Sequence, residues 1–344
     1  MIITIVFISV PLLITLAAFI VGRSLSTKAY KGPKSDHFNG KTFINPADKK
    51  AKGFPDVFKW MVGRDQGPWM KNYETFVGKK PKFPSKDKIK ITFVNHSTFL
   101  IQWNKLNILT DPVWSNRCSP FSFAGPQRMR PPGIQFEDLP KIDLVLLSHN
   151  HYDHLDIHTV KRIEEKFKPT FVVPLGVSDY LTKKNIQKTI ELDWWDETHE
   201  HLKITAVPSQ HFSGRGFFDR DKSLWCGYIL HFDNQKLYFA GDSGYGDFFK
   251  EIGKNMGPMD ISLIPIGAYL PKWFMSPIHV SPDESIKIHK DVKSKQSIAM
   301  HFGTFPLADD GMGRAEKDLQ TALSKTKIKK EQFLIPDEGV PLEF

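Results

Sequence analysis

The sequence predicts an α/β protein built as a layered sandwich rather than as a simple doubly wound sheet. Strand patterns dominate the first third of the folded part, and they alternate with helical patterns later in the chain. Histidines and aspartates follow several of these strands, so the predicted strand ends coincide with the positions of candidate metal ligands. The chain has 344 residues with 40% hydrophobic content, which suffices for one large domain with extensions.

The folded domain is expected to span residues 89–344. It begins where residues 89–94 alternate between apolar and polar side chains, as a half-buried strand does. By the same pattern we predict strands at 89–94, 98–103, 106–109, 143–147, 171–173, 202–207, 226–232, 237–240, 261–266 and 297–300. Helices are predicted at 157–167, 177–184, 282–290 and 315–323.

The N-terminal residues 1–22 carry no charged side chain and form one apolar run that is long enough to span a bilayer. A cleavable signal peptide is the alternative, but there is no basic segment before the run, and the run is longer than a typical signal core. We therefore predict a retained single-pass transmembrane anchor. Lys and Arg follow the run and none precedes it, which favours a cytoplasmic catalytic domain.

Residues 23–88 are rich in Lys, Pro, Gly and Asn, and we interpret them as a basic tether and wrapping extension. A short helix is predicted at 56–62. Two outcomes stay open for the large apolar side chains of this extension, which either dip into a membrane interface or pack onto the main domain: Phe58, Trp60, Met61, Trp69 and Met70.

The formal charge of +9 indicates attraction to an anionic partner. A membrane surface, a nucleic acid and a phosphorylated substrate all fit this charge. The Lys residues are scattered and no RNA-binding module is recognisable, so we expect no nucleic-acid partner. The chain has two cysteines, Cys118 and Cys226, without a CxxC motif, which argues against a disulfide framework.

The most informative motif is the run LSHNHYDHL at residues 147–155, directly after an apolar strand pattern. It places His149, His151, Asp153 and His154 within six residues. Imidazole nitrogen and carboxylate oxygen are ligands for Zn²⁺ and neighbouring transition metals, and so dense a cluster would repel itself without a cation. The motif therefore predicts a metal site.

Three further candidate ligands follow strands or lie in polar breaks after them. They are His211 in PSQH, Asp242 in FAGDS and His301 in MHFG. Each taken alone could be a capping or core polar residue. Their occurrence together with the first motif indicates a binuclear cage.

The order HxHxDH, His, GDS and His resembles the metallo-β-lactamase superfamily. The resemblance implies a four-layer αβ/βα sandwich with two metals at one edge, preceded here by the N-terminal membrane anchor. It implies that His149, His151 and His211 hold one metal, that Asp153, His154 and His301 hold the other, and that Asp242 bridges them. Asp111, in the matching LTDP motif, is expected to orient a ligand histidine from outside the cage; capping a turn before proline is a compatible role.

Further motifs resemble the phospholipases D that hydrolyse N-acylphosphatidylethanolamine: ELDWW at 191–195, IPIGAY at 264–269 and WFM at 273–275. The resemblance runs from about residue 54 to the C-terminus. His279 falls where that family has a histidine near the lipid phosphate, although Ile278 precedes it where the animal enzymes have Gln. A helix-entry histidine without a catalytic task is the alternative for His279.

The resemblance implies a zinc-dependent hydrolase that releases N-acylethanolamine and phosphatidate from a membrane phospholipid. Two metals, Zn²⁺ or else Fe or Mn²⁺, would lower the pKa of a bridging water so that hydroxide attacks phosphorus. Asp153, Asp242 and His279 are the candidate catalytic residues, and a homodimer is expected by analogy. The alternatives are a hydrolase of a soluble phosphodiester or a lactone, a nuclease, a diiron redox protein and a scaffold without metals.

Overall fold

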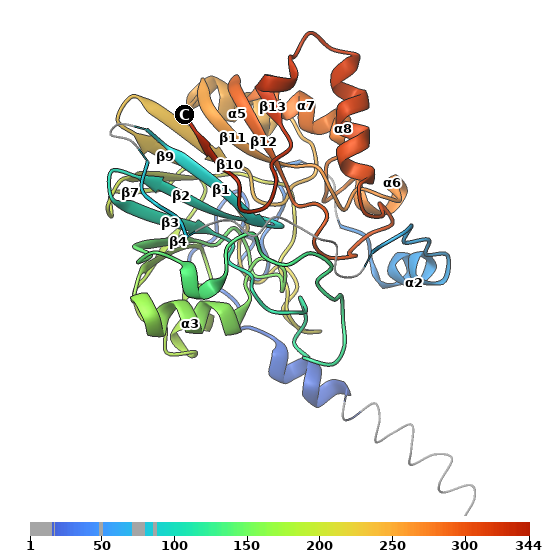
Figure 1. The fold of residues 1–344 in the computed structure, drawn as a ribbon. Helices are drawn as coiled ribbons and strands as arrows, with labels where there is room; N and C mark the ends of the chain where they lie inside the picture. The colour runs from blue at the N-terminus through green and yellow to red at the C-terminus, as the bar shows by residue number, and fades with distance from the viewer. Residues whose placement is uncertain (1–15, 17, 48–50, 71–79, 85–87) are drawn as a thin grey trace, which may run out of the picture.

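The computed structural model describes residues 1–344 except 1–15, 17, 48–50, 71–79 and 85–87. Two seven-stranded sheets form the middle of the molecule, and helices lie on their outer sides (Figure 1). In each sheet one half is antiparallel and the other half is parallel. The arrangement confirms the layered α/β sandwich that the sequence predicts.

The first sheet has the strand order β14-β1-β2-β3-β4-β5-β6. Its strands come from the first half of the domain, except that the last strand of the chain pairs antiparallel with β1 and closes one edge. The bounds are β1 (Lys90–Asn95), β2 (Thr98–Trp103), β3 (Leu106–Thr110), β4 (Leu144–Leu146), β5 (Thr170–Pro174), β6 (Thr189–Leu192) and β14 (Pro341–Glu343).

The second sheet has the order β13-β12-β11-β10-β9-β8-β7 and mirrors the first in its division between parallel and antiparallel pairs. Its bounds are β7 (Glu197–Thr198), β8 (Lys203–Val207), β9 (Gly227–Phe232), β10 (Gln235–Phe239), β11 (Met259–Pro265), β12 (Ser294–Met300) and β13 (Phe333–Leu334).

Helices cover the outer faces of both sheets. On the first sheet, Val160 and Ile163 of α3 share a buried cluster with Val94 and Leu100, while the neighbouring Phe93 belongs to the larger cluster between the sheets. Both faces of the sheets are therefore apolar, which explains the nearly continuous apolar strand sequences. The longer helices are α2 (Phe54–Val62), α3 (Ile157–Phe167), α5 (Phe248–Asn255), α7 (Pro282–Asp291) and α8 (Arg314–Ser324), and the shorter ones are α4 (Ser178–Thr182), α6 (Lys272–Met275), η1 (Phe136–Asp138) and η2 (Lys330–Gln332).

Part of the predicted wrapping extension packs on the domain. Phe38 and Phe43 are buried in the main core. The side chain of Asp219 accepts hydrogen bonds from the backbone N–H and the hydroxyl of Thr27. His37 lies 2.6 Å from the Asp193 carboxylate. These contacts fix residues 27–47 along the second half of the sandwich before the chain reaches α2.

No helix among the described residues is long and apolar enough to cross a membrane. The anchor predicted at residues 1–22 lies largely outside the described part of the chain. Residues 18–25 are helical, and Leu16, Phe19 and Ile20 are more than half exposed.

The ion pair that docks the extension predicts a pH dependence of stability. Burial alone would lower the pKa of His37, but Asp193 and Asp36 outweigh burial and raise the pKa above its ordinary value of 6.5. Because the pKa of this histidine is higher in the folded than in the unfolded protein, its protonation stabilises the fold. The stabilisation is complete below the unfolded-state pKa, and it is lost as the pH rises through the folded-state pKa. We expect the free energy of unfolding, measured in urea, to fall as the pH rises above the ordinary histidine value of 6.5, and to fall less in His37→Gln. His199→Gln, at an exposed histidine, is the control, and an equal fall in all three proteins would contradict the prediction.

Candidate metal centre

The candidate ligands converge because the carboxyl ends of strands from both sheets meet at one edge of the sandwich. His149 to His154 follow β4, His211 follows β8, Asp242 follows β10 and His301 follows β12. Strands that are far apart in the sequence thereby deliver their polar residues to one place.

The first group consists of three imidazoles. His149 Nε2 lies 2.9 Å from His151 Nδ1, and His211 Nε2 lies 3.2 Å from the same atom. His149 and His211 are almost fully buried, with 1% of their surface exposed. Burial lowers the pKa of both far below the ordinary value, and it contributes most to lowering the pKa of His151 to about 4. These imidazoles are therefore neutral at pH 7, which is the form that binds metals.

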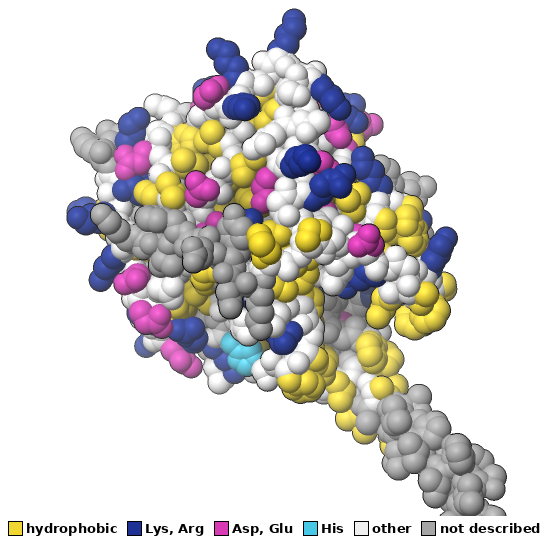
Figure 2. Space-filling model, turned by 45° about the vertical axis from the view of Figure 1, so that its right-hand side comes forward, with side chains coloured by type: hydrophobic (Ala, Val, Ile, Leu, Met, Phe, Trp, Pro, Cys, Tyr) yellow, Lys and Arg dark blue, Asp and Glu magenta, His cyan; other side chains and the backbone are white. Residues whose placement is uncertain are grey.

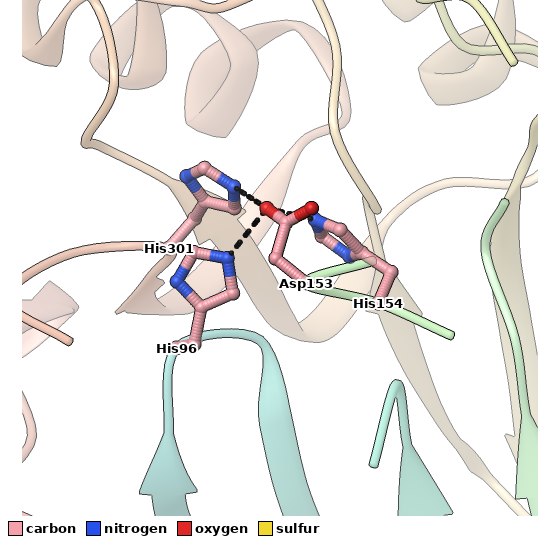
Figure 3. Close-up of side chains that lie close together, drawn as sticks. All are labelled: His96, Asp153, His154 and His301. Atoms are coloured by element: carbon pink, nitrogen blue, oxygen red, sulfur yellow. Dashed lines mark hydrogen bonds and ion pairs between the residues drawn. The ribbon is translucent and has the colours of Figure 1, made fainter. Parts of the chain in front are cut away.

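The second group surrounds the carboxylate of Asp153 (Figure 3). His96 Nε2, His154 Nε2 and His301 Nε2 lie 3.0, 3.3 and 3.4 Å from Asp153 Oδ2. All four side chains are within the reach of one ion, because their candidate ligand atoms lie within 4.8 Å of one another.

Asp242 lies between the two groups. Its Oδ2 atom is 3.1 Å from His154 Nε2, 3.0 Å from His301 Nε2 and 3.8 Å from His211 Nε2. The nearby His279 Nδ1 is also 3.8 Å away. One carboxylate thus reaches histidines of both groups, which is the position that a bridging ligand requires.

Asp111 holds this arrangement from behind, as the sequence predicts for it. Its Oδ2 accepts a hydrogen bond from His154 Nδ1 at 2.6 Å and another from the Ser148 hydroxyl. The backbone N–H of Ser148 donates to Asp111 Oδ1 at 2.7 Å. His211 Nδ1 likewise donates to the carbonyl oxygen of Ile278. These contacts fix the tautomers so that both Nε2 atoms face the cluster.

The charges of the centre compensate each other through protons. Burial alone would lower the pKa of His154, but the carboxylates of Asp242 and Asp153 raise it well above its ordinary value. The pKa of His301 is raised to about 9 in the same way. Burial opposes ionisation of both carboxylates, yet the histidines hold their pKa values well below the usual range. A divalent cation would supply the positive charge that these two imidazoles carry as protons.

The buried polar atoms fit a shared cation. His154 Nε2, His301 Nε2 and Asp242 Oδ1 are buried without making a hydrogen bond, although the first two lie close to the other oxygen of Asp242. Buried polar atoms almost always have hydrogen-bond partners. Atoms that converge without bonding each other are the donor set that a metal ion satisfies.

A glycine next to Asp242 permits the close packing of the loops. Gly241 has φ of 62°, and a Cβ atom there would lie 2.9 Å from the Cys226 carbonyl oxygen and 2.9 Å from Ser148 Cβ. Any other residue would displace the loop that carries Asp242 or the loop that carries His149.

The extension also supports the centre. Asn45 Oδ1 accepts a hydrogen bond from the backbone N–H of His211 at 2.9 Å, and Asn45 Nδ2 donates to the His211 carbonyl oxygen at 2.8 Å. The indole N–H of Trp225 donates to the same Oδ1. A residue from the predicted tether therefore fixes the backbone of a candidate ligand, and no sequence pattern predicts this contact.

His96 is the candidate ligand that sequence analysis missed. It lies in the tight turn between β1 and β2 with φ of 47°, and 2% of its surface is exposed. Its carbonyl oxygen accepts a hydrogen bond from the backbone N–H of His301 at 2.7 Å. A histidine directly after a strand was the available signal, the same signal that pointed to His301.

Comparisons with known proteins agree with this geometry. A family model described as a beta-lactamase superfamily domain matches residues 106–302. A phospholipase D of Caenorhabditis elegans that hydrolyses N-acyl-phosphatidylethanolamine is 38% identical over 272 residues, which are 75% of this chain and 76% of that protein. The chain belongs to the metallo-β-lactamase superfamily. It is a metal-dependent hydrolase of that fold.

A mitochondrial N-acyl-phosphatidylethanolamine-hydrolysing phospholipase D of Saccharomyces cerevisiae is 36% identical over 234 residues, which cover 66% of this chain and half of that protein. Among solved structures, a metallohydrolase of Ignicoccus hospitalis superposes with a TM-score of 0.57 at 22% identity, covering 75% of this chain and 98% of its own. This last similarity concerns the fold alone.

The structure thus brings together every residue that the sequence placed in the cage, and His279 and Asp111 lie against it. It separates none of them. The division into two metal ions, their identity and the catalytic roles of Asp153, Asp242 and His279 stay predictions.

The contacts of His96 predict that it positions Asp153 for the second metal. His96→Ala removes the histidine that lies nearest to Asp153 Oδ2, at 3.0 Å, and loss of such an orienting contact typically lowers metal affinity about 10–100-fold. Metal retention during titration with a competing chelator measures this effect. His96→Gln, which keeps an N–H donor, should lose less, and His231→Ala on the distant β9 should lose nothing. Unchanged affinity in His96→Ala would remove His96 from the site.

Proposed function

We propose that this protein is a zinc-dependent phosphodiesterase of the phospholipase D type that hydrolyses N-acylphosphatidylethanolamine to N-acylethanolamine and phosphatidate. The observation that carries the proposal is the buried cluster of seven predicted ligands in a chain 38% identical to a nematode enzyme of that name. The similarity extends over three quarters of both chains, and the superfamily match at residues 106–302 includes all seven of these residues.

In this proposal His149, His151 and His211 would hold one Zn²⁺, Asp153, His154 and His301 would hold the other, and Asp242 would be shared. Two such ions lower the pKa of water, which supplies the nucleophile, and they withdraw charge from phosphoryl oxygens. The residues that remain partly accessible then act on the substrate, because only they can touch it.

Asp153 and His279 are two of these partly accessible residues, with 14% and 12% of their side-chain surface exposed; the third is His151, one of the three histidines assigned to the first metal. In this proposal Asp153 accepts the proton of the attacking water. His279 binds the phosphodiester or protonates the leaving amino-alcohol oxygen, with water as the alternative acid. Ile278 contributes its carbonyl oxygen to His211, a contact independent of its side chain, so the departure from Gln alters only side-chain contacts.

The proposed partners are a membrane phospholipid as substrate and a bilayer as the surface on which the enzyme works. The apolar N-terminal run, the +9 charge and the exposed side chains of Leu16, Phe19, Ile20 and Val21 support this assignment. The cytoplasmic location of the catalytic domain and a homodimer belong to the same proposal. A lipid substrate suits such an enzyme because lipid and protein then meet by diffusion in two dimensions.

Product analysis by mass spectrometry tests the proposal. The metal-replete protein is incubated with mixed micelles of N-acylated and ordinary phosphatidylethanolamine, with and without a chelator. We expect N-acylethanolamine and phosphatidate from the N-acylated lipid only, and we expect the chelator to abolish the release because the cluster then lacks its cations.

Absence of product would also distinguish between the candidate functions. A protein that contains two metals and releases no product from either lipid would keep its place among the metal-dependent hydrolases. It would lose the phospholipase assignment in favour of a soluble phosphodiester or a lactone.

Asp242→Asn tests the bridging role at nearly constant volume. Because Asp242 approaches histidines of both groups, we expect turnover to fall by more than the roughly 100-fold that loss of an outer contact costs. Circular dichroism should show an unchanged fold. Asp247→Asn, at a carboxylate that is 85% exposed, is the matched control. Near wild-type turnover in Asp242→Asn, or in His149→Ala, would show that the cage is wrongly assigned.

A further inference from the structure

The helix α2 presents a row of large apolar side chains to the outside. Phe54, Phe58, Met61 and Val62 are 82%, 63%, 64% and 75% exposed. Their spacing places them on one side of the helix, and we call these four side chains the apolar face of α2. Contiguous apolar surface of this kind on a soluble protein marks an interaction site.

The opposite side of α2 is fixed to the domain. Val57 and Trp60 pack against α6 and its neighbours, and the Trp60 ring stacks on Phe274 with 5.0 Å between centroids. The indole N–H of Trp60 donates to Asp309 Oδ2 at 3.1 Å, and Arg64 lies 4.6 Å over the ring. The fold therefore holds the apolar face outward. The sequence left open whether these side chains pack on the domain or face a membrane. Trp60 packs on the domain, and Phe58 and Met61 point to solvent.

The surroundings of this face suit a lipid headgroup region. Trp273 of α6 is 43% exposed, and Lys59 Nζ lies 5.0 Å above its ring. Tryptophan and lysine are enriched where membrane meets water, because each combines an apolar body with a polar end. The net charge of +9 adds attraction to anionic lipids.

A second exposed apolar area lies at the N-terminal helix. Phe19 and Ile20 are 54% and 57% exposed, and the Phe19 ring contacts Phe218, whose neighbour Phe217 is 72% exposed. In Figure 1, α2 lies at the right-hand side of the molecule and this helix lies at its lower end. Hydrophobic side chains gather along these two margins (Figure 2). This helix overlaps the end of the apolar, uncharged run at residues 1–22.

We propose that the apolar face of α2 inserts into the interfacial layer of a lipid bilayer. It gives the domain a contact with the membrane in addition to the N-terminal segment, and two separated contacts fix the orientation of the domain. This inference rests on the proposed function, because a lipid substrate is what makes a defined orientation useful. A second copy of the chain is the weaker occupant, since four side chains are too few for the about 800 Å² that a stable partner buries.

Site-directed spin labelling of the full-length protein in phospholipid nanodiscs tests the proposal. The nanodiscs contain phosphatidylcholine with a fraction of phosphatidylglycerol. A nitroxide is attached at Phe58→Cys, and the matched control is Phe83→Cys, at a phenylalanine that is 45% exposed elsewhere on the surface. Both native cysteines are buried and should react little.

We expect the ratio of accessibility to oxygen over accessibility to a water-soluble nickel chelate to be severalfold higher at position 58 than at position 83. Equal ratios would overturn the proposal. Spin–spin broadening at position 58 that disappears on dilution with unlabelled protein would overturn it as well, in favour of a contact between two copies.

This experiment contains no N-acylated lipid, so it separates the docking from the chemistry. A bilayer-inserted label in a protein that releases no product would refute the phospholipase activity and retain the docking surface. Product release from a protein whose label stays in water would do the reverse. Met61→Ser, outside the candidate metal centre, should lower turnover of the lipid in vesicles severalfold and leave turnover in mixed micelles unchanged.

Discussion

Two carboxylates, Asp153 and Asp242, lie among histidines at the edge of the sandwich, where solvent can hardly compensate their charge. A buried carboxylate is costly unless a cation or hydrogen bonds neutralise it. The raised pKa values of His154 and His301 favour protonated imidazoles that neutralise them when no metal is bound, and metal ions would take over this role. The strand order of both sheets, the glycine before Asp242 and the position of Asp111 all serve to hold these charges together.

The histidines that neutralise these carboxylates also have to be held in a fixed orientation. A hydrogen bond from the Nδ1 atom turns the Nε2 atom of a candidate ligand histidine toward the cluster. Asp111 accepts this bond from His154, and the Ile278 carbonyl oxygen accepts it from His211. The N-terminal extension takes part, because Asn45 fixes the backbone of His211 from both sides. The segment that links the domain to the apolar run is thus mechanically continuous with the metal centre.

The elements predicted from periodicity agree with the structure where burial imposes a clear pattern. The predicted helix at 157–167 and strand at 98–103 have the observed bounds of α3 and β2. The missed helix α5 contains Gly253, where a Cβ would lie 1.8 Å from the Asp291 carbonyl oxygen of α7. The close packing of α5 against α7 requires glycine at this position, and glycine has a low helix propensity, so the sequence pattern of α5 is weak. The prediction missed the strands β6, β7, β13 and β14. They have two to four residues, too few for a clear periodicity, and they exist through pairing with β5, β8, β12 and β1.

The sequence by itself determined the chemistry of the centre, because ligand type and spacing in 147–155 are local properties, and because the remaining ligands each follow a strand. It also determined the layered α/β class through the succession of strand and helix patterns. Only the tertiary structure decided which residues meet. It added His96, hidden in a hairpin turn 57 residues before its partner Asp153, and Asn45, 166 residues before His211. It also decided which side of α2 faces outward, since contacts between distant segments depend on how the sheets pack and leave no trace in local sequence.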